Sequence, residues 1–118
     1  MANILIVEDE MNMLRLLRDW LEFHDHTVYM ATDGQKGLEM LNNHIVTPDV
    51  IISDLSMPHM DGLELVTQLK QSEQWKHTHI IIISGSKVDE KNAIGAGANQ
   101  FLLKPFTLSH LENALSKV

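Results

Sequence analysis

Five short runs of mostly apolar residues recur along the chain, and a segment with helical spacing of apolar residues follows each run. Continuous runs of branched apolar residues are typical of strands that are buried on both faces of a parallel sheet. The predicted strands are Asn3–Val7, Thr27–Ala31, Val50–Asp54, Ile80–Ser84 and Gln100–Leu103. A strand–helix pair repeated five times predicts an α/β fold, a doubly wound (βα)5 domain with helices on both faces of a five-stranded parallel sheet.

The segments between the predicted strands should be helices, and capping or breaking residues mark their ends. The second helix is expected to include Ile45 and to stop at Thr47–Pro48. The fourth helix, within Val88–Ala96, is expected to be short because glycines weaken its C-terminal end. In the last helix, Ser109 and Glu112 have the spacing of a capping box.

Length and composition narrow the class of protein. The chain has 118 residues, and we expect one domain over 1–118. It contains no cysteine, which excludes disulfides, thiolate metal sites and cysteine nucleophiles. Its formal charge of −7 argues against binding to nucleic acid or anionic lipid. The apolar runs are too short to cross a bilayer, and the acidic N-terminal segment is unlike a signal peptide. We therefore expect a cytoplasmic domain.

Polar side chains follow four of the five predicted strands, at the point where each strand ends. In chain order they are Glu8, Asp9, Asp54, Ser84 and Lys104. In a doubly wound sheet the ligand site lies beyond the carboxyl ends of the strands, where the strand order reverses. We therefore expect three carboxylates, one hydroxyl and one ammonium group to meet in one site.

The predicted carboxylate cluster requires a cation. Two carboxylates about 4 Å apart repel each other by roughly 4 kcal/mol at an effective dielectric constant near 20. Ligands that are all oxygen atoms favour Mg²⁺, which would keep positions open for water or a phosphoryl oxygen. Lys104 adds a positive charge, and Ser84 can donate a hydrogen bond to an incoming oxygen. This combination indicates a phosphoryl-transfer site with an aspartate nucleophile.

Four motifs occur together in a characteristic order and spacing. They are the acidic pair Glu8–Asp9, the segment Asp54–Gly62 (DLSMPHMDG), Ser84 after an isoleucine run, and Phe101–Phe106 (FLLKPF). Through these motifs the chain resembles, over essentially its whole length, the receiver domain of two-component response regulators, including those of chemotaxis. The resemblance implies the strand order 2-1-3-4-5 in a three-layer α/β/α arrangement.

The resemblance also implies how the acidic residues act. Asp54 would accept the phosphoryl group. Asp9, Asp54 and the backbone carbonyl of Ser56 would bind Mg²⁺ directly, and Glu8 would act mainly through metal-bound water.

The same resemblance implies roles for three further residues, Lys104, Ser84 and Phe101. Lys104 would pair with the aspartate and then with the phosphoryl group, and a cis Lys104–Pro105 bond would aim it inward. Ser84 would close on a phosphoryl oxygen, and Phe101 would turn inward as Ser84 moves. An ordinary strand end and an ordinary core aromatic are the alternative explanations for Ser84 and Phe101.

In function, the resemblance implies a signalling switch rather than an enzyme with its own small-molecule substrate. A sensor histidine kinase or a histidine phosphotransfer protein would supply the phosphoryl group. The domain would catalyse its own phosphorylation and slow dephosphorylation, and the readout surface would be the fourth helix, fifth strand and fifth helix. The partner that responds to the switch would be a downstream effector protein or an output domain outside these residues. A dimer that forms on phosphorylation is a further alternative. A start at Met1 fits either a stand-alone receiver or the N-terminal domain of a longer regulator.

Three other classes of function fit the pattern less well. Haloacid-dehalogenase-like phosphatases also form an aspartyl-phosphate, but they need a second acid two residues after the nucleophile, where this chain has Ser56. A docking module that is never phosphorylated would have no need for the charged cluster. A flavodoxin-like flavin protein needs a phosphate loop rich in hydroxyl groups and glycine after the first strand, and this sequence has none there.

Two pairs of histidines have the H-x-H spacing that can place two imidazoles on one face of an extended segment. The pairs are His24/His26 and His77/His79. Both are expected in polar loop stretches without a third nearby ligand, so we expect ordinary surface residues rather than zinc ligands.

Overall fold

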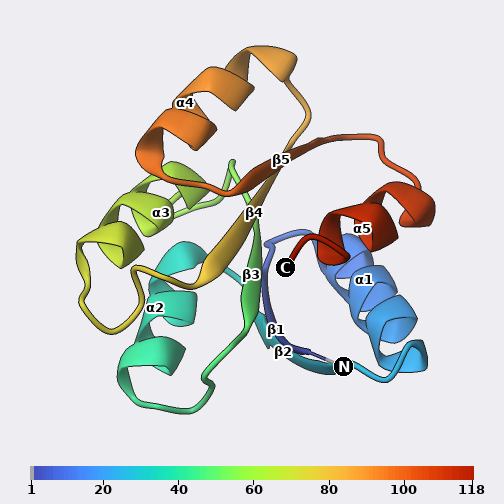
Figure 1. Cartoon of the computed structure of the whole chain (residues 1–118), viewed down its shortest axis with the longest axis horizontal. Coiled ribbons are helices and arrows are strands. Elements are labelled where there is room, and N and C mark those ends of the chain that lie inside the picture. The colour runs from blue at the N-terminus through green and yellow to red at the C-terminus, as the bar shows by residue number, and fades with distance from the viewer. Residues whose placement is uncertain (1) are drawn as a thin grey trace.

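The computed structural model describes residues 2–118. Its sheet is parallel throughout, with the strand order β2-β1-β3-β4-β5 (Figure 1). The strands are β1 Asn3–Val7, β2 Thr27–Ala31, β3 Val50–Asp54, β4 His79–Ser84 and β5 Gln100–Leu103. The predicted fold class and strand order are therefore confirmed, and β4 starts one residue earlier than the sequence indicated.

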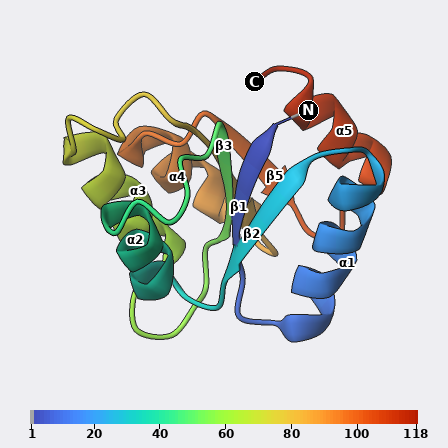
Figure 2. The same ribbon diagram turned by 90° about the horizontal axis from the view of Figure 1, so that it is seen from below.

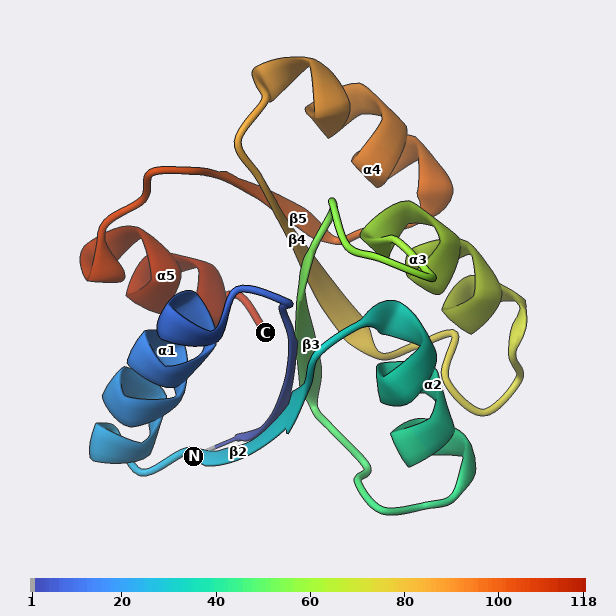
Figure 3. The ribbon, with the colours of Figure 1, turned by 180° about the vertical axis from the view of Figure 1, so that it is seen from behind.

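Helices cover both faces of this sheet. They are α1 Met11–Phe23, α2 Gly34–Asn42, α3 Gly62–Gln71, α4 Glu90–Ala96 and α5 Leu108–Leu115, with a short 3-10 helix η1 at Lys87–Asp89. Helices α1 and α5 lie on one face and α2, α3 and α4 on the other, as Figures 2 and 3 show from two further directions. Within residues 2–118, every helix is too short or too polar to span a bilayer.

The sheet has a separate hydrophobic core on each side. Side chains alternate along a strand, so Ile4 and Ile6 of β1 pack toward α1 and α5, whereas Leu5 and Val7 pack toward α2 and α3. Full burial of a Leu, Ile or Val side chain contributes roughly 1.5–3 kcal/mol. Because β1, β3 and β4 are buried on both faces, their carboxyl ends are held firmly, and these ends carry the polar residues of the predicted site.

One predicted helix end is wrong. Helix α2 ends at Asn42 and does not include Ile45, whose side chain is 58% exposed. The reason is the backbone of His44, which has φ 56° and accordingly lies in the left-handed region, where a right-handed helix cannot continue. The chain thus leaves the helix before it reaches Thr47–Pro48.

The predicted cap of the last helix is also wrong. Thr107, not Ser109, is the N-cap of α5: its hydroxyl accepts a hydrogen bond from His110 N, and its own amide donates to His110 Nδ1. Thr107 is the last residue with extended backbone, so it takes the cap position first and leaves Ser109 inside the first turn. The expectation for the fourth helix is confirmed, because α4 has only seven residues and ends at Ala96, with Gly97 as its C-cap.

Candidate functional site

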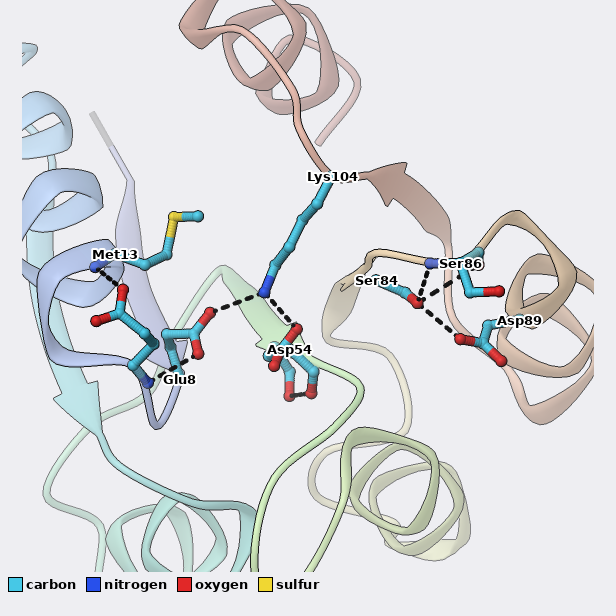
Figure 4. A network of polar contacts seen from close by, with 9 residues as sticks. Glu8, Met13, Asp54, Ser84, Ser86, Asp89 and Lys104 are labelled. Atoms are coloured by element: carbon cyan, nitrogen blue, oxygen red, sulfur yellow. Dashed lines mark hydrogen bonds and ion pairs between the residues drawn. The ribbon is translucent and has the colours of Figure 1, made fainter.

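The carboxyl ends of β1, β3 and β5 bring four of the predicted site residues together, and Figure 4 shows Glu8, Asp54 and Lys104 among them. Asp54 is the last residue of β3 and is 6% exposed, and Glu8 directly follows β1 and is 1% exposed. Asp9 is the exposed member of the acidic group. One carboxylate oxygen from each of these three residues lies within 4.8 Å of the other two.

Lys104 joins this acidic cluster from the segment that follows β5. Its Nζ lies 2.9 Å from Asp54 Oδ1 and 3.5 Å from Glu8 Oε1, and the dashed lines in Figure 4 mark both contacts. Its amide donates to the backbone carbonyl of Ser84 at 2.7 Å, which fixes the chain beside β4. The Lys104–Pro105 peptide bond is cis, as the resemblance implied.

The turn after β1 explains why Glu8 points inward. Its Oε2 accepts a hydrogen bond from Glu10 N at 3.0 Å. Glu10 in turn caps α1, because its carboxylate accepts from the amides of Asn12 and Met13. These local bonds link the Glu8 carboxylate to the start of α1 and hold it next to Lys104.

The burial of the carboxyl groups has an electrostatic consequence. Burial raises the pKa of Asp54 above its ordinary value; Lys104 opposes this rise, and the charge of Asp9 adds to it. Burial likewise raises the pKa of Glu8, and Asp54 contributes to the rise. Burial alone would lower the pKa of Lys104, but the hydrogen bond and charge of Asp54 outweigh it and raise that pKa. One ammonium group therefore balances only part of the charge of three carboxylates.

The donor set fits a hard divalent cation. Glu8, Asp9 and Asp54 offer carboxylate oxygens, which are the ligands that Mg²⁺ prefers, and no nitrogen or sulfur ligand belongs to this cluster. Burial is the main reason that the pKa values of Glu8 and Asp54 are raised, and a cation here would offset the negative charge that burial makes unfavourable. Ser56, the expected carbonyl ligand, is exposed in the loop between β3 and α3.

Ser84 lies at the end of β4, as predicted, but its hydroxyl is engaged away from Asp54. The side chain is 5% exposed, and its Oγ donates to Asp89 Oδ2 at 2.7 Å and accepts from Ser86 N at 3.1 Å. Figure 4 shows this group on the far side of Asp54 from Glu8. Sequence reasoning missed Asp89, because nothing in the pattern of apolar residues reveals a contact within this loop.

Phe101 and Gly62, two residues of the predicted motifs, lie in the fold as follows. Phe101 of β5 is half-buried and packs against the core that faces α2, α3 and α4. Gly62, the first residue of α3, lies so close to β3 that a Cβ atom there would collide with the backbone carbonyl oxygen of Asp54. Gly62 ends the motif Asp54–Gly62, but its residue type does not reveal this role, which depends on how closely α3 approaches the strand end.

Two curated relatives are similar to this chain over almost its whole length. The KDP operon transcriptional regulatory protein KdpE of Escherichia coli K12 is 38% identical over 98% of this chain and 50% of its own length. The sensor histidine kinase TmoS of Ectopseudomonas mendocina is 36% identical over 98% of this chain, but over only 12% of its own length. This chain thus spans half or less of these two relatives.

A solved structure and a family model agree with these relatives. The response regulator protein TrrA of Thermotoga maritima, solved in complex with Mg²⁺ and beryllium fluoride, superimposes with a TM-score of 0.88 at 25% identity, over 99% of this chain and 98% of TrrA. The family model for the response regulator receiver domain matches residues 4–116. The chain therefore belongs to the family of response regulator receiver domains.

Proposed function

We propose that residues 1–118 form a phosphoacceptor receiver domain of a two-component or phosphorelay system, with Asp54 as the phosphoacceptor. The observation that carries this proposal is the contact of Lys104 Nζ with Asp54 Oδ1 at 2.9 Å, inside a cluster that also holds Glu8 and Asp9. Family membership supports a switch in place of an enzyme that turns over a substrate of its own. The donor would be the phosphohistidine of a sensor histidine kinase or of a histidine phosphotransfer protein.

In the proposed reaction, Asp54 is the nucleophile. A carboxylate oxygen attacks phosphorus, the phosphorus–nitrogen bond of the phosphohistidine breaks, and its electron pair stays on the imidazole of the donor. The product is an acyl phosphate on Asp54, which the domain would itself hydrolyse slowly. Because Asp54 ends a strand buried on both faces, its carboxylate is held in place before the donor arrives.

Lys104 would keep Asp54 in the anionic form that the attack requires. After the transfer, its ammonium group would pair with the phosphoryl oxygens. Glu8, Asp9 and Asp54, with the backbone carbonyl of Ser56, are the residues that would hold Mg²⁺, Glu8 mainly through bound water. When bound, Mg²⁺ supplies positive charge that offsets the charge of the carboxylates and of the transferring group. The Mg²⁺–beryllium fluoride complex of the relative TrrA supports this assignment.

The conformational response would begin at Ser84 and Phe101. Once attached to Asp54, the phosphoryl group carries about −1.5 to −2 charge units in place of the single negative charge of the carboxylate, and it offers new acceptors to the Ser84 hydroxyl. Movement of Ser84 would let Phe101 turn inward, which favours a second conformation of the domain. The readout surface would consist of α4, β5 and α5, where Ile94 and Leu103 are exposed.

The partners follow from this role. The readout surface would act on a downstream effector protein, on an output domain outside these residues, or on a second copy in a dimer that forms on phosphorylation. We expect the domain to work in the cytoplasm and not to bind nucleic acid or membranes directly, in line with its formal charge of −7.

The experiment that tests the proposed function is the intact mass of the protein after incubation with acetyl phosphate, with and without Mg²⁺. We expect a labile gain of one phosphoryl group only with Mg²⁺, and no gain in Asp54→Asn. A matched control is Asp25→Asn, since Asp25 is exposed and has φ 67°, a conformation that asparagine tolerates. Undiminished labelling of Asp54→Asn would overturn the assignment.

A further inference from the structure

The hydroxyl of Ser84 has a partner that the proposed reaction does not use. Its Oγ donates to Asp89 Oδ2 at 2.7 Å, whereas the Ser86 carbonyl, the other acceptor nearby, lies 3.4 Å away. A hydroxyl has one hydrogen to donate. While Asp89 receives that hydrogen, Ser84 cannot donate it to an oxygen on Asp54.

Asp89 is the N-cap residue of α4, a position where a carboxylate usually accepts a hydrogen bond from an amide in the first turn of the helix. It is the last residue of η1 and directly precedes α4, yet its side chain makes no capping hydrogen bond to that helix. The backbone of Asp89 is helical, with φ −76° and ψ −16°, and not extended as at a typical N-cap. The carboxylate is thus committed to Ser84 and not to the amides of α4, as Figure 4 illustrates.

We propose that Asp89 is a positioning residue that holds Ser84 out of the phosphoacceptor site until a phosphoryl group on Asp54 competes for the same hydroxyl hydrogen. This inference rests on the proposed function, because it needs a phosphoryl group on Asp54. The competition is between two anions: the carboxylate of Asp89, which already holds the hydroxyl, and the more highly charged phosphoryl group.

The same contact connects the phosphorylation site to the proposed readout surface. Asp89 is the last residue of η1, and α4 begins directly after it. Val88, the residue before Asp89 in η1, is 80% exposed. Once Ser84 turns away, η1 loses its side-chain hydrogen bond to the end of β4, and the Asp89 carboxylate becomes free to cap α4. Release of one hydrogen bond thereby alters the start of the helix that partners would contact.

The inference is tested by the affinity of the protein for beryllium fluoride, a phosphoryl mimic, measured in the presence of Mg²⁺. In Asp89→Ala, binding no longer has to break a charge-assisted hydrogen bond, so we expect about tenfold tighter binding than in the wild type. Asp89→Asn keeps an oxygen acceptor without the charge, and its affinity should fall between the two. The matched control is Glu90→Gln, since Glu90 pairs with Lys87 at 2.6 Å instead of with Ser84.

A purely structural role of Asp89 is separated from this one by a double-mutant cycle. If Asp89 acts through Ser84, the Asp89→Ala change should have no effect on affinity in a Ser84→Ala background. An equal gain in both backgrounds would overturn the inference, as would unchanged or weaker binding by Asp89→Ala in a wild type that takes up the phosphoryl group normally. A wild type that neither binds the mimic nor reacts with acetyl phosphate would overturn the proposed function together with the inference.

Discussion

Lys104 and Asp54 meet at 2.9 Å although their strands are not neighbours in the sheet. Asp54 ends β3 and Lys104 follows β5, and β4 lies between these two strands. The long lysine side chain crosses the end of β4 to reach the carboxylate, and it also contacts Glu8, which directly follows β1, the strand next to β3. One ammonium group thus links three parts of the chain that come together only in the folded domain.

The first prediction concerns Lys104→Met, which keeps much of the side-chain length but removes the ammonium group. We expect the rate of labelling by acetyl phosphate to fall roughly 100-fold, as when one preorganised donor to a developing charge is lost. The measurement is the time course of intact mass with Mg²⁺ present. Lys117→Met, at an exposed lysine near the C-terminus, should label at the wild-type rate. A wild-type rate in Lys104→Met would remove Lys104 from the reaction.

The second prediction is that Mg²⁺ stabilises the fold. The pKa values of Glu8 and Asp54 are raised chiefly because burial removes water from the two carboxylates. A bound cation would offset the negative charge of these carboxylates. At 100 times its dissociation constant, a ligand that binds only the folded state adds about 2.7 kcal/mol to the free energy of unfolding. Urea denaturation with MgCl2, against NaCl of equal ionic strength, measures the gain. We expect the gain to shrink in Asp9→Asn; an identical gain there would contradict the ligand assignment.

The third prediction concerns the close approach of α3 to Asp54. Gly62→Ala would place a Cβ against the Asp54 carbonyl oxygen and 3.0 Å from Leu55 Cα, so the helix or the strand end must shift. We expect a loss of about 1–3 kcal/mol in the free energy of unfolding and slower labelling of Asp54. Gly95→Ala is the matched control: it has nothing within 4 Å and lies in α4, where alanine should stabilise the helix. Equal stabilities of the two variants would disprove the close approach.

The fourth prediction is a pH dependence of stability that arises at His26. Its Nδ1 accepts a hydrogen bond from Ala2 N at 3.0 Å, which only the neutral ring can do at that atom. Burial, followed by nearby positive charge that includes His24, lowers the pKa of His26 below its ordinary value of 6.5. The unfolded chain therefore binds the proton more readily, so this contribution to stability is complete above pH 6.5 and is lost as the pH falls toward the lowered value.

The direction of this pH dependence is checked by comparing urea unfolding of the wild type and of His26→Gln between pH 5 and pH 7.5. The variant should lose less stability on acidification, because glutamine can accept from Ala2 without titrating. His77→Gln, at an exposed histidine, should keep the wild-type dependence. An unchanged dependence in His26→Gln would assign the effect to other groups.

The sequence predicted the strands well because their signal is local. Residues such as Ile80–Ile83 form an uninterrupted branched run that fits a strand buried on both faces. The meeting of Glu8, Asp54 and Lys104 could also be predicted, since topology alone brings the carboxyl ends of parallel strands to one edge.

The parts that could not be predicted depend on competition between nearby groups. Thr107 and Ser109 are both good cap residues, and only the position where the chain leaves the β5–α5 connection decides between them. His44 ends α2 through its backbone conformation, which its residue type does not reveal. The contact of Ser84 with Asp89 requires the path of the loop through η1, and no apolar periodicity reports on it.

The central claim is tested most directly by mapping where the phosphoryl group goes. After reaction with acetyl phosphate and Mg²⁺, borohydride reduces an aspartyl-phosphate to the alcohol homoserine, which peptide mass spectrometry locates in the chain. The account predicts homoserine at position 54 alone, with Glu8 and Asp9 unmodified in the same digest. Modification at Asp9, or a phosphoryl gain that leaves position 54 as aspartate, would contradict it.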